Sequence, residues 1–392
     1  MVLNICEGLH WIGALDPELR VFDIIMHTEK GTTYNSYLIQ AEKTAVVDAV
    51  KERFAEEYLE NIRSLTDPKD IDYIVVNHTE PDHSGAIVHL LEEAPNAVVI
   101  CSQAGYNFLR QLINKDFDYE IVKEGDTLDL GGKTLKFLSV PLLHWPDTIF
   151  TYLAEDKVLL SCDGFGAHYC HEKMFNDLVG DFSEQFKYYF EMIMGPFMPM
   201  VLDAVKKAHG LEIEIICPSH GPIHRDSPMQ YVDLYEKWST PAPKGDEKKL
   251  LIAYVSAHGL TEKIAKAVSE GAAEVPKVDV DLVEISGADR GELADKVNKA
   301  DGLLIGSPTI VSNIVAPVME LLNGINPVVH RGKKAGAFGS YGWSGEAVPM
   351  IIERLKSLRL SVVEPGMRVN FAPSSEDLEE AREFGRSFAA KL

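Results

Sequence analysis

The sequence predicts an α/β protein of two domains, an αβ sandwich of mixed sheets followed by a doubly wound parallel sheet of five strands. At roughly 100 to 200 residues per domain, the 392 residues suggest two domains. A stretch rich in proline, glycine and charge, STPAPKGDEKK at 239–249, is typical of a linker and predicts domains at 1–245 and 250–392. After this stretch, apolar runs alternate regularly with helical patterns.

The first domain is expected to contain short strands joined by hairpin-like turns, with helices at 52–65 and about 84–93. Apolar or alternating runs bounded by turn residues indicate the strands. These runs are TYNSYLIQ (33–40), KTAVVDAV (43–50), DYIVVNH (72–78), NAVVICS (96–102), KTLKFLSV (133–140) and TIFTYLAEDKVLLSCDG (148–164). Because two kinds of connection are mixed, we expect mixed sheets covered by helices.

The second domain is expected to contain five parallel strands that alternate with helices. The strands are LLIAYV (250–255), VDLVEI (280–285), DGLLIG (301–306), KKAGAFG (333–339) and RLSVVEPGMRV (359–369). The helical patterns cover 261–274, 292–300, 347–358 and 376–392, the last capped by Ser374 or Ser375. This alternation places ligand-binding loops at the carboxyl ends of the strands.

Composition excludes several classes of function. The net charge of −22 and the pI near 5.0 oppose binding to nucleic acid or to an anionic membrane surface. The sequence shows neither a signal peptide nor a run of about 18 apolar residues, so we expect a cytoplasmic protein with no membrane partner. Its cysteines form no C-x-x-C pair, which argues against a disulfide framework or a thiolate metal site; they are Cys6, Cys101, Cys162, Cys170 and Cys217.

The motif NHTEPDHSG, residues 77–85, contains four candidate metal ligands: His78, Glu80, Asp82 and His83. It follows the apolar strand DYIVV, and Pro81 argues against a regular helix through it. We therefore expect an extended loop whose alternating side chains point to one side, with His83 starting the next helix. A simpler alternative is a turn in which Asp82 or Ser84 caps that helix.

Three further strand ends carry comparable side chains. His144 in PLLHWPD, Asp163 in LLSCDGFG and His220 in ICPSHGP each follow an apolar run and precede a turn. Packing alone does not explain four strand ends that each present an imidazole or a carboxylate. Together the seven residues predict one dinuclear metal site, with Asp163 as the bridging carboxylate.

This set of residues resembles the metallo-β-lactamase fold, whose hydrolases commonly carry H-x-H-x-D-H. Here Glu80 stands where that pattern has its second histidine. A hard anionic oxygen in place of a neutral nitrogen favours iron, which cycles between ferrous and ferric, over zinc. The motif is similar to that of the flavodiiron proteins.

Three loops of the second domain are candidates for a flavin site. SAHGLTEKIA (256–265) resembles the flavodoxin loop T-x-T-G-x-T, with Ser256 for the first threonine and His258 at the third position. GSPTIVSNI (306–314) and FGSYGWSGEAV (338–348) supply hydroxyls, glycines and flat aromatic rings. The candidates are Ser256, His258, Gly259, Leu260, Thr261, Ser307, Pro308, Thr309, Asn313, Ser340, Tyr341, Gly342, Trp343 and Gly345. Alternatively, the first loop is an ordinary helix start and Trp343 a core aromatic anchored at the surface.

The resemblance implies a metallo-β-lactamase-like αββα domain followed by a flavodoxin-like domain. It further implies reduction of dioxygen to water, of nitric oxide to nitrous oxide, or both, at a non-haem diiron site that receives electrons through FMN. By motif, one iron is held by His78, Glu80 and His144, the other by Asp82, His83 and His220, and Asp163 bridges them. Some family members leave the histidine equivalent to His83 unbound.

Partners and supporting residues follow from the same resemblance. A separate electron donor such as rubredoxin or a reduced deazaflavin is expected, with Lys263 and Arg331 as candidate docking residues. A head-to-tail homodimer or a dimer of dimers is expected to bring the flavin of one subunit to the irons of the next. Tyr188 is the first candidate to donate a hydrogen bond to bound substrate, and Tyr189 is the second. The residues expected to support the ligands are Trp145, Asp147 and His168.

Two other functions compete with this hypothesis. One is a dizinc metallo-β-lactamase-like hydrolase fused to a flavodoxin-like domain, which would normally need nitrogen at position 80. The other is an electron carrier whose metal-binding half is inert, which does not explain seven converging polar residues. The preference between dioxygen and nitric oxide and the identity of the donor stay open.

Overall fold

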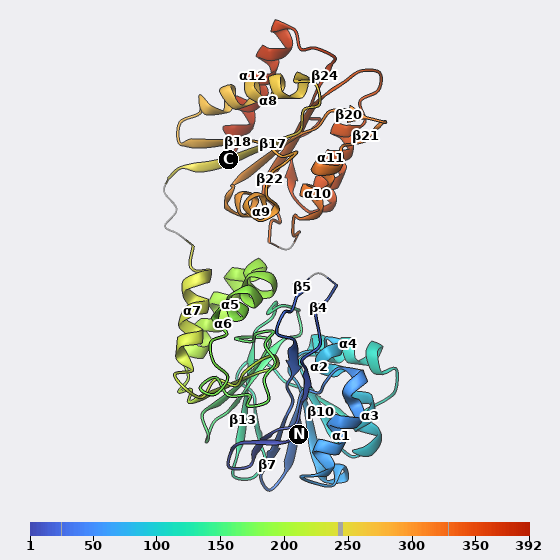
Figure 1. The fold of residues 1–392 in the computed structure, drawn as a ribbon, viewed down its shortest axis with the longest axis vertical. Helices are drawn as coiled ribbons and strands as arrows, with labels where there is room; N and C mark the ends of the chain where they lie inside the picture. The colour runs from blue at the N-terminus through green and yellow to red at the C-terminus, as the bar shows by residue number, and fades with distance from the viewer. Residues whose placement is uncertain (25, 242–245, 328) are drawn as a thin grey trace. The chain divides into compact units, whose positions relative to one another are not determined.

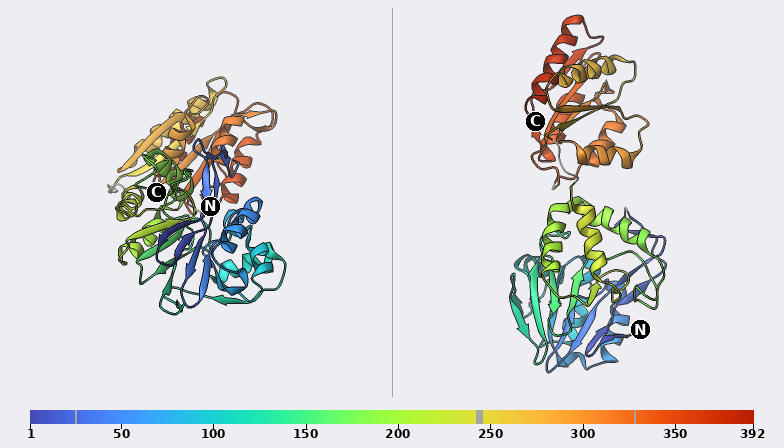
Figure 2. Two further views of the ribbon diagram at one scale, coloured as in Figure 1. Left: turned by 60° about the horizontal axis from the view of Figure 1, so that its bottom comes forward. Right: turned by 90° about the vertical axis from the view of Figure 1, so that its left-hand side faces the viewer.

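The computed structural model describes residues 1–24, 26–241, 246–327 and 329–392. It divides into two compact units, Met1–Pro241 and Ala242–Leu392 (Figures 1 and 2). Residues 242–245 of the predicted linker lie outside the described residues. In the part of the chain that the structure describes, no helix is long and apolar enough to span a membrane.

The first unit is a sandwich of two sheets with helices on its outer faces (Figure 1). One sheet has the order β1 (Leu3–Cys6), β2 (Leu9–Trp11), β7 (Tyr37–Gln40), β8 (Thr44–Val47), β9 (Ile71–Val76), β10 (Val98–Cys101), β11 (Tyr119–Ile121). The other has the order β12 (Thr127–Asp129), β13 (Thr134–Ser139), β14 (Ile149–Leu153), β15 (Val158–Cys162), β16 (Ile215–Pro218). The helices are α1 (Ala55–Arg63), α2 (Pro81–Ser84), α3 (Ile87–Glu93), α4 (Gln103–Ile113), α5 (Ser183–Tyr189), α6 (Met198–His209) and α7 (Met229–Ser239).

Strand burial on both faces explains why the central strands read as unbroken apolar runs. In β8, Val46 joins the core under the outer helices, whereas Ala45 and Val47 join the core between the two sheets. Side chains alternate across a strand, so a strand covered on both faces needs apolar residues at every position. The longest predicted run, 148–164, is the antiparallel pair β14 and β15.

The second unit is a parallel sheet in the order β18 (Val278–Glu284), β17 (Lys248–Tyr254), β19 (Gly302–Gly306), β22 (Lys334–Tyr341). The fifth predicted strand is divided into β23 (Ser361–Val362) and β24 (Met367–Asn370), and both pair with β22. Around the sheet lie α8 (Leu260–Ala273), α9 (Arg290–Lys299), α10 (Ala316–Asn323), α11 (Ala347–Ser357) and α12 (Ser375–Ala389). This is the doubly wound flavodoxin order, which brings the loops after β17, β19 and β22 to one edge.

Two helical layers cover this sheet. Leu250 and Ile252 of β17 pack with α8 and α12, and Leu251 and Ala253 pack toward α9, α10 and α11. Ser374 is the cap of α12, because its Oγ accepts from Asp377 N (3.1 Å) while Asp377 Oδ2 accepts from Ser374 N (2.7 Å).

Helices α8 and α12 approach each other through glycines. A Cβ placed on Gly385 would lie 2.0 Å from Val268 O, and one on Gly271 would lie 1.9 Å from Arg382 O. We expect Gly385→Ala to lower the free energy of unfolding of this unit by about 2 kcal/mol, because the helices must separate. Denaturant titration measures the loss, with Gly287→Ala as control, since a Cβ at Gly287 meets no atom within 4 Å. Equal stability of the two variants would contradict the close helix contact.

Candidate functional site

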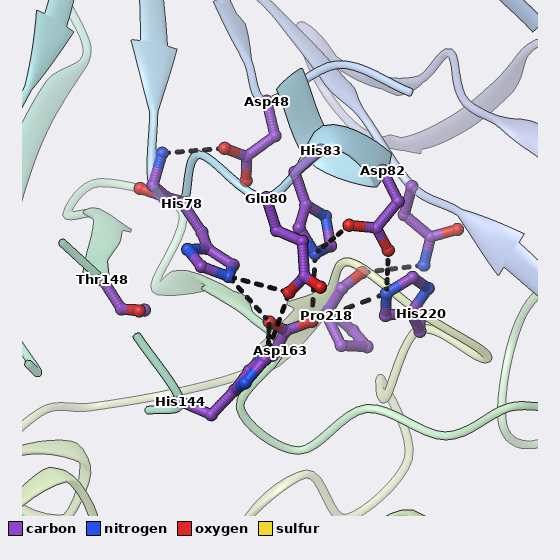
Figure 3. Close-up of polar contacts among 12 residues, drawn as sticks. Asp48, His78, Glu80, Asp82, His83, His144, Thr148, Asp163, Pro218 and His220 are labelled. Carbon is purple, nitrogen blue, oxygen red and sulfur yellow. Dashed lines mark hydrogen bonds and ion pairs between the residues drawn. The ribbon is translucent and has the colours of Figure 1, made fainter. Parts of the chain in front are cut away.

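Seven polar side chains from four strand ends meet at one end of the first unit (Figure 3). They follow β9, β13, β15 and β16, and they are His78, Glu80, Asp82, His83, His144, Asp163 and His220. The ligand atoms of His78, Glu80, His144 and Asp163 lie within 4.8 Å of one another. Those of a second group, Asp82, His83 and His220, do so as well.

The segment that carries the first four ligands differs from the expected extended loop. Pro81 does not exclude a helix there but begins one, α2, with Glu80 as its N-cap. Proline fits the first turn of a helix because it lacks only an N–H that would have no partner there. Glu80 therefore precedes a helical turn that carries Asp82 and His83, and the next helix starts later, at Ile87.

Asp163 lies between the two groups of ligands. Its Oδ2 is 3.5 Å from His144 Nε2 and 3.7 Å from His78 Nε2. Its Oδ1 is 3.2 Å from His83 Nε2 and 3.5 Å from His220 Nε2. One carboxylate oxygen thus faces each group, which suits a residue that bridges two cations.

The remaining carboxylates each belong to one group. Glu80 Oε2 lies 2.9 Å from His144 Nε2 and 3.3 Å from His78 Nε2. On the other side, Asp82 Oδ2 lies 3.1 Å from His220 Nε2. Each group therefore combines imidazole nitrogen with carboxylate oxygen, a donor set that suits iron and also tolerates zinc.

Buried atoms without partners indicate that this cluster is built for cations. Both carboxylate oxygens of Asp82, both ring nitrogens of His83 and Oδ2 of Asp163 form no hydrogen bond with any described residue, and these three residues are at most 5% exposed. Burying unpaired polar and charged groups costs several kcal/mol. Metal ligation would remove that cost, so the residues present fit a metal pair.

The cluster is strongly coupled electrostatically. Burial alone would lower the pKa of His144, but the carboxylates of Asp163 and Glu80 raise it to about 10. Burial alone would raise the pKa of Glu80, yet hydrogen bonds from His144 and His78 hold it well below its usual range. Protonated imidazoles thus supply the positive charge that the carboxylates need, and a bound cation would replace those protons.

Two histidines are oriented by neighbours outside the cluster. His78 Nδ1 lies 3.1 Å from Asp147 Oδ2, which also accepts from the backbone N–H and hydroxyl of Thr79. His220 Nδ1 lies 2.6 Å from the carbonyl oxygen of Thr33. Donation from Nδ1 leaves Nε2 of both rings free to face the ligand groups.

The two other supporting residues pack against ligand rings. Trp145 meets His78 edge-on at 5.1 Å between centroids. His168 lies 5.2 Å from His220, and its Nδ1 is bonded to Thr32 Oγ1 (2.9 Å). Burial holds the pKa of His168 well below its usual value. His168 is therefore neutral at physiological pH.

Sequence reasoning missed two residues beside the cluster. Asp48, at the end of β8 with φ 55°, accepts from Asn77 N (2.7 Å), and burial raises its pKa to about 6. Cys162 places its sulfur within 4.8 Å of ligand atoms of His83 and Asp163. Asp48 could have been found, because it is a carboxylate near the end of the apolar run KTAVVDAV. Nothing in the sequence around Cys162 indicated that its thiol lies beside the cluster.

Tyr189, and not the expected Tyr188, contacts the cluster. The Tyr189 hydroxyl donates to Asp163 Oδ1 (3.0 Å) and its ring is buried. Tyr188 is half-buried, and no hydrogen bond among the described residues joins it to the seven. The spacing of Phe182, Phe186 and Tyr189 marks one helix face, and it was the signal that could have separated the two tyrosines.

A hollow of about 430 Å³ lies at the expected edge of the second unit. Ten of the fourteen predicted flavin residues line it: Ser256, His258, Leu260, Thr261, Pro308, Thr309, Ser340, Tyr341, Gly342 and Trp343. Four others lie beside it and do not line it: Gly259, Ser307, Asn313 and Gly345. The lining residues that the prediction missed are Ala257, Ile310, Val311 and Phe371.

Short contacts hold the loops of this hollow. Thr261 Oγ1 is hydrogen-bonded to Ser340 Oγ (2.8 Å), which joins the start of α8 to the end of β22. Gly259, with φ +76°, turns the chain into α8. The side chains of Trp343 and Phe371 are 88% and 61% exposed, which is unusual for such large rings. Exposed aromatic rings of this kind are typical of a surface that binds a ligand or a partner.

Comparison with known proteins agrees with both halves. Residues 32–221 match the ODP family beta lactamase model and residues 252–385 match the flavodoxin model. The chain is 45% identical over 395 residues to a type A flavoprotein, fprA, of Rhodobacter capsulatus, covering 99% of this chain and 91% of that one. It is 41% identical over 402 residues to the flavo-diiron protein FprA2 of Clostridium acetobutylicum, covering 100% and 99%.

This chain belongs to the flavodiiron protein family. The expected metallo-β-lactamase-like and flavodoxin-like folds are thereby confirmed. Another relative of this flavodiiron protein is a nitric oxide reductase of Moorella thermoacetica, 39% identical over 400 residues, with 99% of this chain and 98% of that one covered. The solved structure of the rubredoxin oxygen:oxidoreductase of Desulfovibrio gigas matches at a TM-score of 0.69 and 31% identity, covering 100% and 98%.

The Asp147 contact predicts an effect on metal affinity. We expect Asp147→Asn to weaken iron(II) binding about 10- to 100-fold, because a neutral amide oxygen holds the Nδ1 proton of His78 more weakly than a carboxylate does. Competition with a chelator measures the affinity. Asp203→Asn, at an exposed position of α6, is the control. Identical affinities in the two variants would show that Asp147 does not orient the ligand.

Proposed function

We propose that this flavodiiron protein reduces dioxygen to water, nitric oxide to nitrous oxide, or both, at a non-haem diiron site. The observation that carries the proposal is Asp163, which directs one oxygen to each of two ligand groups, one of which contains Glu80. Relatives named for each reaction, the Moorella nitric oxide reductase and the Desulfovibrio oxidoreductase, support it.

The ligands are assigned by the two groups. His78, Glu80, His144 and Asp163 Oδ2 would hold one iron, and Asp82, His83, His220 and Asp163 Oδ1 the other. Bound there, the irons together with FMN would supply the electrons that either gas takes up. Glu80 and the two aspartates give the cluster three carboxylates, which lower its net charge. A lower net charge stabilises ferric iron, and it therefore favours a diiron redox site over a dizinc hydrolase site.

Tyr189 is the proposed hydrogen-bond donor beside the irons. Burial raises the pKa of its phenol well above the usual value, so the hydroxyl keeps its proton. That proton points to Asp163 Oδ1, at the edge of the ligand set. Tyr189 can therefore hold the carboxylate in place or turn its proton toward a bound gas molecule.

The flavin hollow supplies the electron route. Ser256, Thr261 and the start of α8 are proposed to bind the FMN phosphate, and the rings of Tyr341 and Trp343 to flank the isoalloxazine. Electrons come from a separate donor such as rubredoxin or a reduced deazaflavin. A head-to-tail homodimer, or a dimer of such dimers, would place the flavin of one subunit against the irons of another.

Metal and flavin content tests the proposal. Iron, zinc and FMN are measured per chain on anaerobically purified protein, and the reduced sample is then mixed with dioxygen or nitric oxide in a stopped-flow instrument. We expect about two irons, one FMN and rapid flavin oxidation by at least one gas. Two zincs with a flavin that neither gas oxidises would overturn the proposal and favour the fused hydrolase.

The two neighbouring tyrosines give a matched pair of variants. We expect Tyr189→Phe to slow turnover about tenfold, because one hydrogen bond beside the irons is lost. Tyr188→Phe should turn over like the unmodified protein. Steady-state rates at equal iron content measure both. If the two variants behave alike, Tyr189 has no role in turnover.

A further inference from the structure

The flavin hollow contains a single side chain that can become positively charged. Of the fourteen residues that line it in the described chain, His258 is the only basic one, and none is acidic. Tyr341 is the other ionisable side chain among them, and it cannot carry a positive charge. The remaining lining side chains are small, apolar or hydroxylic, so His258 alone gives this hollow a charge that depends on pH.

The position of His258 places it where a phosphate would bind. It stands in the loop between β17 and α8, at the third position of the flavodoxin-like pattern, where the resembled loop has threonine. The backbone N–H groups of residues 257–261 find no acceptor among the described residues. Such a row of free N–H groups at a helix start attracts an anion.

The charged groups around this loop leave the phosphate short of positive charge. On α8, Glu262 lies close, with Oε2 4.0 Å from a Cβ built on Gly259, although it is paired with Lys266 (2.6 Å). Lys263 is the next residue of α8 and does not line the hollow. Opposite, beside Tyr341, Glu346 accepts from Gly345 N (3.0 Å). The whole chain carries −22, which further opposes a phosphate.

We propose that the His258 imidazolium pairs with the phosphate of FMN and makes FMN affinity depend on pH. The inference rests on the flavin site of the proposed function and adds its regulation. A phosphate monoester becomes dianionic near pH 6, and a free imidazole loses its proton near 6.5. The dianion stabilises the imidazolium, so FMN affinity is greatest near neutral pH and falls as the pH rises and the imidazolium charge is lost.

The test uses the full chain loaded with FMN. Serial dilution at pH 6.5 and at pH 8.5 releases the flavin, and its recovered fluorescence gives the dissociation constant. We expect about tenfold weaker FMN binding at pH 8.5 in the unmodified protein, because a charge-assisted hydrogen bond is lost. His258→Gln should bind more weakly at pH 6.5 and change less than twofold between the two pH values.

Two controls separate the phosphate from the rest of the flavin. Riboflavin, which lacks the phosphate, should bind the FMN-free protein with the same affinity at both pH values. His209→Gln replaces an exposed histidine of α6 in the other unit and should keep the full pH effect on FMN. Circular dichroism at both pH values shows whether each variant is folded.

Three results would overturn the inference. If FMN affinity does not depend on pH in the unmodified protein, His258 does not act as the counter-charge of the phosphate. The same conclusion follows if the affinity of His258→Gln depends on pH as strongly as that of the unmodified protein. A pH effect of the same size with riboflavin would place its origin away from the phosphate. These results leave the flavin site intact, whereas failure of the unmodified chain to bind FMN at any pH would overturn the proposed function as well.

Discussion

The cost of burying unpaired charge is the constraint on which the first unit depends. Three carboxylates and four imidazoles lie together at the ends of strands, where most are almost fully enclosed. Without a cation, only shared protons balance these charges, and several atoms of Asp82, His83 and Asp163 form ion-pair contacts but no hydrogen bond with any described residue. The sandwich can afford such a site because its strands are held by apolar cores on both faces. A bound metal pair would therefore add to the stability of this end of the fold as well as to its chemistry.

Glu80 is the residue that separates the proposed redox site from a hydrolase site. The seven candidate ligands follow strand ends of a metallo-β-lactamase-like domain, a fold that by itself does not decide between hydrolysis and redox chemistry. Glu80 adds an anionic oxygen to the group of His78 and His144, and Tyr189 contributes a protonated hydroxyl next to the bridging carboxylate. In the second unit, a nearly uncharged hollow with exposed aromatic rings suits a flat cofactor that exchanges electrons. The two sites together are consistent with redox chemistry. A hydrolase would not require a flavin-binding domain.

The candidate ligands could be predicted from their local sequence. Residues whose positions depend on packing between distant segments could not. His78, Glu80, Asp163 and His220 could be found because each polar residue ends an apolar strand, which a single sequence shows. The parallel sheet of the second unit was predicted from apolar strand-like runs that alternate with helical patterns. Tyr188 was placed ahead of Tyr189 because the choice between the two depends on which face of α5 packs inward. Phe371 was missed because the pairing of β24 with β22, which brings it beside Tyr341, joins segments far apart in sequence. Pro81 was interpreted as a residue that excludes a helix, but at the first position of α2 proline is compatible with the helix and begins it.

Asp163 is proposed to join two metal positions of different composition. An anomalous difference map, from crystals of the iron-loaded protein measured at the iron absorption edge, tests this arrangement. We expect two iron peaks per chain, one beside Glu80, His78 and His144 and the other beside Asp82, His83 and His220, with one oxygen of Asp163 at each. A single peak, or metal held by the histidines while Glu80 turns away, would contradict it.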